Sequence, residues 1–223
     1  MEEVKVIELK ESVFADNDAE ADRVREDLKS RGQFLLNVMS SPGSGKTTTL
    51  TRLINLLKGD YRIGVMDADI DGALDTNHII SQTGARAIQL HTGGMCHLDA
   101  GMTRTGIDSL DATGLDLVLL ENVGNLVCPA EFDTGASKNA VILSVPEGDD
   151  KPLKYPLMFE KADVVLLNKI DVLPYFDFDL GTFETYLRQR NPHCQLIKIS
   201  AKTGEGMEQL ADWVRHEIDL WRA

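Results

Sequence analysis

The stretch FLLNVMSSPGSGKTTTL, residues 34–50, decides the fold. Its first six residues form a nearly continuous apolar run, which is typical of a strand buried on both faces of a parallel sheet. A loop of small residues follows, and then Lys46 and Thr47 open a segment with helical spacing. A strand, a glycine-rich loop and a helix in this order predict a phosphate-binding loop, because the free N–H groups at a helix start point at anions.

Each loop position has an expected role. Gly43 and Gly45 allow the backbone to bend around phosphate oxygens, Lys46 reaches the β- and γ-phosphates, and the Thr47 hydroxyl ligates Mg²⁺. The strict pattern has Gly at position 40, where this chain has Ser40. The residues of the loop that we expect to bind the nucleotide are Gly43, Ser44, Gly45, Lys46, Thr47 and Thr48.

Six further apolar runs follow along the chain, at 61–67, 85–90, 116–122, 139–145, 162–169 and 195–200. Most of the segments between them, such as 46–58 and 178–190, are long enough for a crossover helix, and an amphipathic pattern closes the chain at about 206–222. The sequence therefore predicts a doubly wound α/β fold, a mostly parallel seven-stranded sheet with helices on both faces.

An amphipathic helix is predicted ahead of this fold, over residues 14–31. The segment is rich in charge, with Ala21, Val24 and Leu28 at helical spacing and Gly32 at its end. We therefore divide the chain into an N-terminal extension and leading helix, 1–32, and a nucleotide-binding domain, 33–223.

Composition excludes several classes of protein. The 223 residues carry a formal net charge of −13, which argues against a nucleic-acid partner. No apolar run approaches the roughly 18 residues of a membrane span. The acidic start MEEVKVIELKES resembles neither a secretory signal nor a transit peptide, so we expect a cytoplasmic protein without a membrane partner.

The nucleotide base is predicted from NKID, residues 168–171. The Asp171 carboxylate can accept two N–H groups that guanine offers and adenine does not, so the expected nucleotide is GTP. Asn168 should brace the loop, and the stem of Lys169 should pack along the base. A third contact to guanine is expected from the end of the next strand, at Ser200, Ala201 and Lys202.

Acidic residues follow two strands, where Mg²⁺ and an attacking water have to be held. Glu121 with Gly124 forms a D/E-x-x-G pattern, in which the Gly N–H contacts the γ-phosphate. Asp67 is the first acid past its own strand. We therefore predict Lys46, Asp67 and Glu121 as catalytic residues, and Thr47, Asp67 and Glu121 as the Mg²⁺ site.

Three more acids follow Asp67. Asp75 is expected to be a solvated residue near a helix start, whereas Asp69 and Asp71 are left open between that role and a role in the site.

The three cysteines of a chain without a disulfide framework can act as thiolates. Cys96, His97 and Cys128 fall in predicted loops at the functional edge of the sheet, and two thiolates with an imidazole suit Ni²⁺ or Zn²⁺. Three ligands do not close a tetrahedral site, and sequence neighbours such as Cys96 and His97 tend to point apart. The residues alone leave two interpretations open: an open site that a second subunit completes, or two unrelated loop cysteines.

The remaining cysteine and two histidines are expected to be ordinary residues. Cys194 lies in an apolar run and should be a small core residue. His78 and His91 should be surface or packing residues.

Together, SSPGSGKTT, MDADIDGALD, GGMCHLDA, ENVGNLVCPAEFD and NKID resemble the HypB-type GTPases that assist nickel insertion into nickel–iron hydrogenase. The similarity runs from about residue 20 to the C-terminus. It implies the SIMIBI class of P-loop NTPases, nickel or zinc at Cys96, His97 and Cys128, and a homodimer when GTP is bound. It also implies GTP hydrolysis that gates metal delivery to a partner nickel chaperone or to the hydrogenase large subunit.

The chain departs from some members of that family, which carry an N-terminal Cys-rich or His-rich nickel-binding segment. Residues 1–35 contain neither Cys nor His, so we expect no separate high-affinity nickel store there. Whether the chain carries nickel over distance or only releases it locally is left open.

Three alternatives remain. A urease-type nickel accessory GTPase should show Cys-Pro-His, whereas here Cys96 precedes His97 and Cys128 precedes Pro129. A nucleotide-regulated binding module would bind GTP without useful hydrolysis. A P-loop kinase would need an Arg-rich lid, which the segment 146–160 does not provide.

Overall fold

The computed structural model describes residues 9–69 and 74–223, with the side chains of 14–68 and 76–223. Asp71 lies outside the described residues, and so do the side chains of Asp69 and Asp75. The solvated role expected of Asp75 therefore stays a prediction, and the roles of Asp69 and Asp71 stay open.

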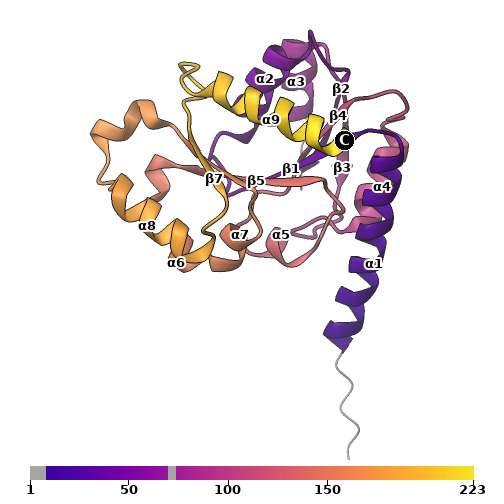
Figure 1. Ribbon diagram of the computed structural model, residues 1–223, viewed down its shortest axis with the longest axis horizontal. Coiled ribbons are helices and arrows are strands. Elements are labelled where there is room, and N and C mark those ends of the chain that lie inside the picture. The colour runs from indigo at the N-terminus through magenta and orange to yellow at the C-terminus, as the bar shows by residue number, and fades with distance from the viewer. Residues whose placement is uncertain (1–8, 70–73) are drawn as a thin grey trace, which may run out of the picture.

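A seven-stranded sheet forms the centre of the chain, in the order β3-β2-β4-β1-β5-β6-β7 (Figure 1). Every pairing is parallel. The seven predicted strands are all present, and the doubly wound α/β fold is confirmed. The strands are β1 Phe34–Ser40, β2 Ile63–Asp69, β3 Arg86–His91, β4 Leu117–Glu121, β5 Lys138–Ser144, β6 Val164–Asn168 and β7 Gln195–Lys198.

Helices cover both faces of the sheet. The longer ones are α1 Leu9–Ser30, α2 Lys46–Leu57, α3 Leu74–Thr83, α4 Ala100–Ser109, α8 Leu180–Arg190 and α9 Met207–Arg222. Short helical turns are α5 Cys128–Glu131, η1 Val145–Glu147, α6 Lys151–Lys154, α7 Pro156–Glu160 and η2 Ile170–Tyr175. In Figure 1, α2, α3 and α9 lie on one face, whereas α7 and α8 lie on the other.

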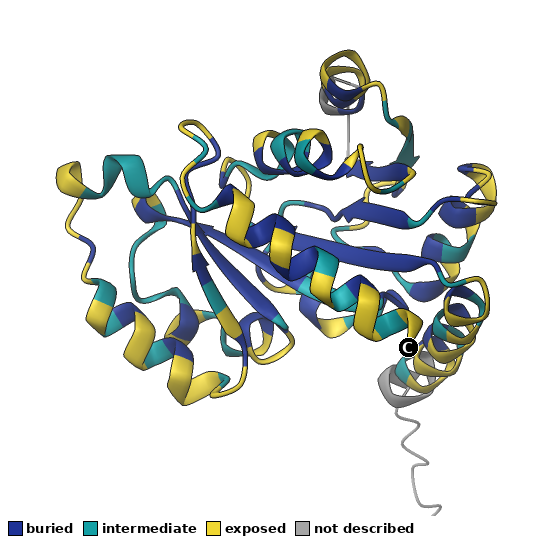
Figure 2. Cartoon of the chain, turned by 45° about the horizontal axis from the view of Figure 1, so that its top comes forward, coloured by how far each residue is buried: buried dark blue, intermediate teal, exposed yellow. Residues whose placement is uncertain are grey.

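Successive side chains of each strand point to opposite faces of the sheet, so the core is divided between the two faces. In β1, Leu36 and Val38 pack with α2 and α9, whereas Leu35 packs with α1 and α4 and Met39 packs with α7 and α8. The central strands are buried along their whole length (Figure 2), which explains why their sequences show continuous apolar runs instead of alternation. Cys194 is a buried core residue, as predicted.

The leading helix α1 packs against the fold through its predicted apolar positions. Val24 and Leu28 are buried beside α4, and the Asn17 side chain accepts a hydrogen bond from the Ala100 N–H at 2.9 Å. Among the described residues, we find no helix with both the length and the apolar character needed to cross a membrane.

The connections after β1 and β4 run in opposite directions along the sheet. β1 continues through α2 to β2 on one side, while β4 continues past α5 to β5 on the other side. A crevice opens at the carboxyl ends of the strands where neighbouring connections diverge in this way, and ligands of doubly wound folds bind there.

At the opposite end of the strands, Asp116 directly precedes β4 and joins neighbouring elements through its side chain. Its carboxylate accepts hydrogen bonds from the Arg62 N–H and Nε, both at 2.9 Å, and from Arg222 Nη2 of α9 at 2.8 Å. The hydrogen bonds from Arg62, followed by those from Arg222, hold the pKa of Asp116 well below its usual value despite the opposing effect of burial. The carboxylate thus links β2, β4 and the C-terminal helix.

Replacing Asp116 with Asn should lower the free energy of unfolding at pH 7 by about 1–2 kcal/mol, because the amide cannot accept the same charged hydrogen bonds. The folded-state pKa lies below the unfolded value of about 4, so the carboxylate stabilises the fold above that pH and loses its effect as the pH falls. Urea unfolding at pH 7 and at about pH 3.5 should therefore show the difference from wild type shrinking in acid.

Asp111→Asn is the matched control, because its side chain is 80% exposed and lies 3.8 Å from its Arg86 partner. It should change stability by less than about 0.5 kcal/mol. Equal losses in the two variants would contradict the proposed link.

Candidate nucleotide and metal site

The glycine-rich loop is shaped for close approach of a ligand and of a second loop. Gly43 and Gly45 have φ of +73° and +98°, which side chains other than glycine rarely adopt. A Cβ at Gly45 would lie 2.5 Å from Nδ2 of Asn168. Gly45 also precedes α2 and has no side chain to occupy its first N–H groups, so these remain available to an anion.

Ser40, the departure from the strict loop pattern, contacts the loop lysine. Lys46 Nζ donates to Ser40 Oγ at 3.0 Å, and Ser40 Oγ donates to the Ser41 carbonyl at 2.7 Å. Ser41 Oγ in turn donates to Glu147, at the end of η1. The consensus pattern of the phosphate-binding loop does not predict these contacts. They fix the position of the Lys46 amine and of the first residues of the loop.

A cleft of about 460 Å³ brings together the phosphate loop and the acidic strand ends. Its lining residues are Pro42, Gly43, Gly45, Lys46, Thr47, Thr48, Asp67, Ala68, Glu121, Asn122, Val123 and Gly124. A Cβ at Gly124 would lie 3.2 Å from the Pro42 nitrogen, so a side chain there would crowd the backbone of the phosphate loop. The predicted Ser44 lies beneath the cleft as a buried residue.

Two carboxylates are buried in the cleft. Asp67 and Glu121 are 2% and 3% exposed and pair with each other across β2 and β4. Asp67 therefore lies within β2, which runs to Asp69, and not past its strand as expected. Thr47 Oγ1 donates to Glu121 at 3.1 Å, and Thr76 Oγ1 donates to Asp67 at 2.7 Å. Two carboxylates and a hydroxyl are an all-oxygen donor set of the kind that Mg²⁺ prefers, so the residues present fit this ion.

A second loop, at the end of β6, is tied to the phosphate loop by its side chains. Asn168 Nδ2 donates to the Ser44 carbonyl at 2.9 Å, and Asn168 Oδ1 accepts from the N–H groups of Lys169 and Ala201 at 2.7 and 3.0 Å. Lys169 has φ of +63°, and its Nζ donates to the Gly43 carbonyl at 2.7 Å. The predicted bracing role of Asn168 matches this geometry.

The loop after β7 orients the predicted base contact. Ser200 Oγ donates to Asp171 Oδ1 at 2.7 Å and accepts from the Thr203 N–H at 3.1 Å. The Lys202 carbonyl accepts from Arg52 of α2 at 2.7 Å. Asp171 is partly exposed in this arrangement.

The two predicted metal-binding cysteines lie side by side. A hydrogen bond with the Cys96 thiol, followed by burial, raises the pKa of the Cys128 thiol. Cys96 lies in a loop, as predicted, whereas the loop prediction for Cys128 is wrong, because Cys128 is the first residue of α5. Pro129 explains the short helix, since its fixed φ suits a first helical turn.

His97 lies beside this thiol pair. Its Nδ1 is 4.0 Å from the Cys96 sulfur, so these neighbours do not point apart as expected. Its ring stacks on Phe132 with centroids 3.8 Å apart, and burial lowers the pKa of His97, which favours the neutral, metal-binding imidazole. Over the described ranges, no three His, Cys, Asp or Glu side chains converge closely enough to hold a metal ion.

The loop between Glu121 and Cys128 joins the cleft to the thiol pair. Asn125 Oδ1 accepts from the Val127 N–H at 2.7 Å, and Asn125 Nδ2 approaches the Cys128 sulfur at 3.6 Å. Beside the two cysteines, Met95 and Val127 are 40% and 51% exposed. His78 and His91, which were predicted to be surface or packing residues, are both exposed.

Comparison with known proteins identifies the family of this chain. Residues 34–198 match the family model described as CobW/HypB/UreG, nucleotide-binding domain. The chain is 45% identical to the hydrogenase maturation factor HypB of Rhizobium leguminosarum bv. viciae over 214 residues, which cover 96% of this chain and 71% of the relative.

Solved structures show the same fold. The crystal structure of HypB from Helicobacter pylori in complex with nickel superposes with a TM-score of 0.86 at 36% identity, over 92% of this chain and 95% of that one. The signal recognition particle receptor FtsY from Elizabethkingia anophelis, at 14% identity and a TM-score of 0.56 over 91% of this chain and 72% of that one, shares the fold alone. The chain belongs to the HypB hydrogenase maturation factors, within the CobW/HypB/UreG family of P-loop nucleotide-binding proteins.

Proposed function

We propose that this chain is a GTP-hydrolysing metallochaperone that assists nickel insertion into nickel–iron hydrogenase, with metal binding coupled to GTP-dependent dimerisation. The observation that carries the proposal is one short loop, 122–127, which lines the nucleotide cleft at Gly124 and ends at the thiol of Cys128. The HypB relative and the nickel-bound HypB structure support nickel as the cargo.

Guanine selectivity is assigned to Asp171. Its carboxylate is oriented by Ser200, and its loop is fixed against the phosphate loop by Asn168. A carboxylate held in this way pairs with the two N–H groups of guanine and would remain unpaired beside adenine.

Hydrolysis is assigned to Lys46, Asp67 and Glu121. Lys46, positioned by Ser40, places its charge against the β- and γ-phosphates, and Gly124 offers its N–H to the γ-phosphate. Thr47, Asp67 and Glu121 would hold Mg²⁺, whose positive charge would stabilise the negative charge that develops on the phosphate oxygens. Asp67, within β2, is the candidate for orienting the attacking water.

Nickel binding is assigned to Cys96, Cys128 and His97. Two soft thiolates and one neutral imidazole suit Ni²⁺ or Zn²⁺, yet they leave the ion under-coordinated within one chain. The exposed apolar side chains of Met95 and Val127 flank this pair, which suits contact with a second copy of the chain. A GTP-bound dimer would complete the site, and hydrolysis would release the metal to a nickel chaperone or to the hydrogenase large subunit in the cytoplasm.

Asp171→Asn should reverse base selectivity. The amide can donate to the carbonyl that xanthine presents, so GTP affinity should fall about a hundredfold or more while affinity for xanthosine triphosphate rises. Competition of GTP, ATP and xanthosine triphosphate against a fluorescent nucleotide measures this change. Asp177→Asn, an exposed position six residues on, serves as the control, and wild-type GTP affinity in Asp171→Asn would contradict the assignment.

Asp67→Asn and Glu121→Gln should each slow GTP hydrolysis about a hundredfold, because each removes a charge at the reacting phosphate. Nucleotide should still bind, since the phosphate loop and the base contacts are unchanged. Single-turnover hydrolysis measured beside nucleotide affinity separates the two steps. The exposed Asp108→Asn should hydrolyse GTP like wild type, and equal rates in all three variants would argue for a binding module without hydrolysis.

Nickel and zinc affinity should depend on the bound nucleotide, and linkage then requires the metal to change nucleotide or dimer affinity by the same factor. Calorimetric titration of the GTP-analogue and GDP forms should give about one metal ion per dimer with the analogue. Cys128→Ala should lose this site, whereas Cys194→Ala, which changes the core cysteine, should keep it. Normal metal binding by Cys128→Ala would refute the assignment.

A further inference from the structure

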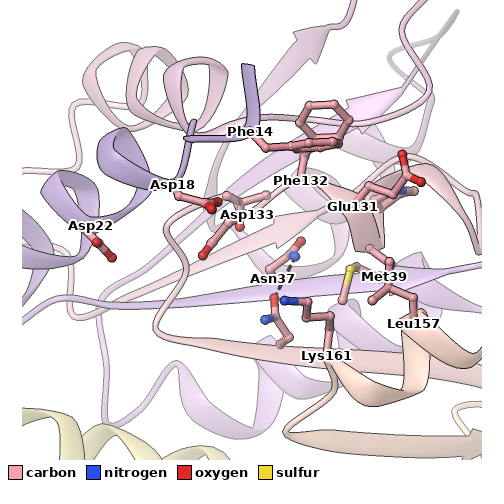
Figure 3. A pocket seen from close by; sticks show the side chains of 14 residues that line it. Phe14, Asp18, Asp22, Asn37, Met39, Glu131, Phe132, Asp133, Leu157 and Lys161 are labelled. Carbon is pink, nitrogen blue, oxygen red and sulfur yellow. Dashed lines mark hydrogen bonds between the residues drawn. The ribbon is translucent and has the colours of Figure 1, made fainter. Parts of the chain in front are cut away.

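Three asparagine side chains form a chain of hydrogen bonds across the sheet. Asn37 of β1 donates from Nδ2 to Oδ1 of Asn139 in β5 at 2.9 Å, and it accepts at Oδ1 from Nδ2 of Asn122 at 3.0 Å. Asn122 directly follows β4 and is fully buried, while Asn37 is 2% exposed. Figure 3 shows Asn37 beside Lys161 and Met39, where it lines a cavity of about 540 Å³.

One backbone N–H group fixes how the three asparagine amides are oriented. Asn122 Oδ1 accepts from the N–H of Val123 at 2.8 Å, and a backbone N–H can only donate. Asn122 must therefore present its NH₂ to Asn37, and Asn37 must present its own NH₂ to Asn139. Any other amide orientation would place two donors or two acceptors together.

Asn122 is the point where the loop 122–127 leaves the sheet. Its N–H donates to the Val38 carbonyl at 3.0 Å, so backbone and side chain both tie it to β1. Two residues later Gly124 packs against Pro42, and Asn125 reaches Cys128. The orientation of Asn122 thus sets the start of the segment that contacts both nucleotide and thiol.

Packing alone gives no reason for an amide at position 37. Its neighbours on the same face of β1, Leu35 and Met39, are both apolar and buried. An amide buried at such a position costs free energy unless its hydrogen bonds are made, and here its partners lie on two other strands or strand ends. The Asn37 amide therefore orients Asn122 and does not simply fill the core.

We propose that Asn37 is a positioning residue, which holds the loop 122–127 through Asn122 so that nucleotide state and the Cys128 thiol change together. The inference rests on the proposed function and deepens it, because it names the residue that couples the two sites. Asn37 itself does not line the nucleotide cleft.

Asn37→Ser and Asn37→Leu test this inference in the full chain. Serine ends one bond short of the amide and cannot reach Asn122, whereas leucine keeps the branching of the side chain and removes both hydrogen bonds. Both should lower kcat for GTP about tenfold with KM nearly unchanged, because the γ-phosphate contact is misplaced while the binding contacts remain. The ratio of nickel affinities between the GTP-analogue and GDP forms should fall to within about twofold of one.

Asn139→Asp is the matched control. Its carboxylate still accepts from Asn37, so the bond between Asn37 and Asn122 persists and the wild-type affinity ratio should be kept. Thermal unfolding and nickel affinity of the GDP form establish that each variant is folded. Serine is the less disruptive change, so it decides the test if the leucine variant does not fold.

The outcomes separate the two claims. A wild-type protein with equal nickel affinity in both nucleotide states would overturn the proposed function, and the inference with it. A wild-type protein whose affinities differ, beside an Asn37→Ser protein that keeps both kcat and that difference, would overturn the inference alone. Loss of the difference in Asn37→Ser, with Asn139→Asp unchanged, is the expected result.

Discussion

The side chain of Asn168 is the constraint on which the rest of the site depends. One amide donates to the carbonyl of Ser44 and accepts from the backbone of its own loop and of the loop after β7. Three loops from strands distant in sequence are thereby fixed together, and a buried amide with all of these bonds made is stable only in that arrangement. Gly45 is needed for the same reason, since a Cβ there would collide with this amide.

Local sequence motifs made much of the fold and of the site predictable. All seven strands and the helices α2, α8 and α9 follow from apolar runs and spacing, because parallel strands buried on both faces have few alternative patterns. The contacts that the sequence did not reveal join residues far apart in the chain, such as Ser41 with Glu147 and Asp116 with Arg222. No local pattern encodes such pairs. The short helix at Cys128 was missed because four residues give no period.

The two ends of the sheet have different roles. At one end, Asp116 ties β2 and β4 to α9 with charged hydrogen bonds. At the other end, glycines, buried acids and a thiol pair meet where the connections of β1 and β4 diverge. A rigid edge behind a crevice of loops allows the loops to respond to a ligand without loss of the strand register, because the register is fixed by the buried faces of the sheet.

The buried acids also bear on whether the nucleotide is hydrolysed or only bound. Asp67 and Glu121 are almost inaccessible to solvent, on adjacent strands within one cleft. If both are ionised, two carboxylates beside the proposed triphosphate site would repel it and each other, so they would weaken binding unless a cation lay between them. A module that only bound GTP would gain affinity from neutral residues at both positions. Carboxylates at both positions are expected if a cation and a water have to be held at the γ-phosphate, as hydrolysis requires.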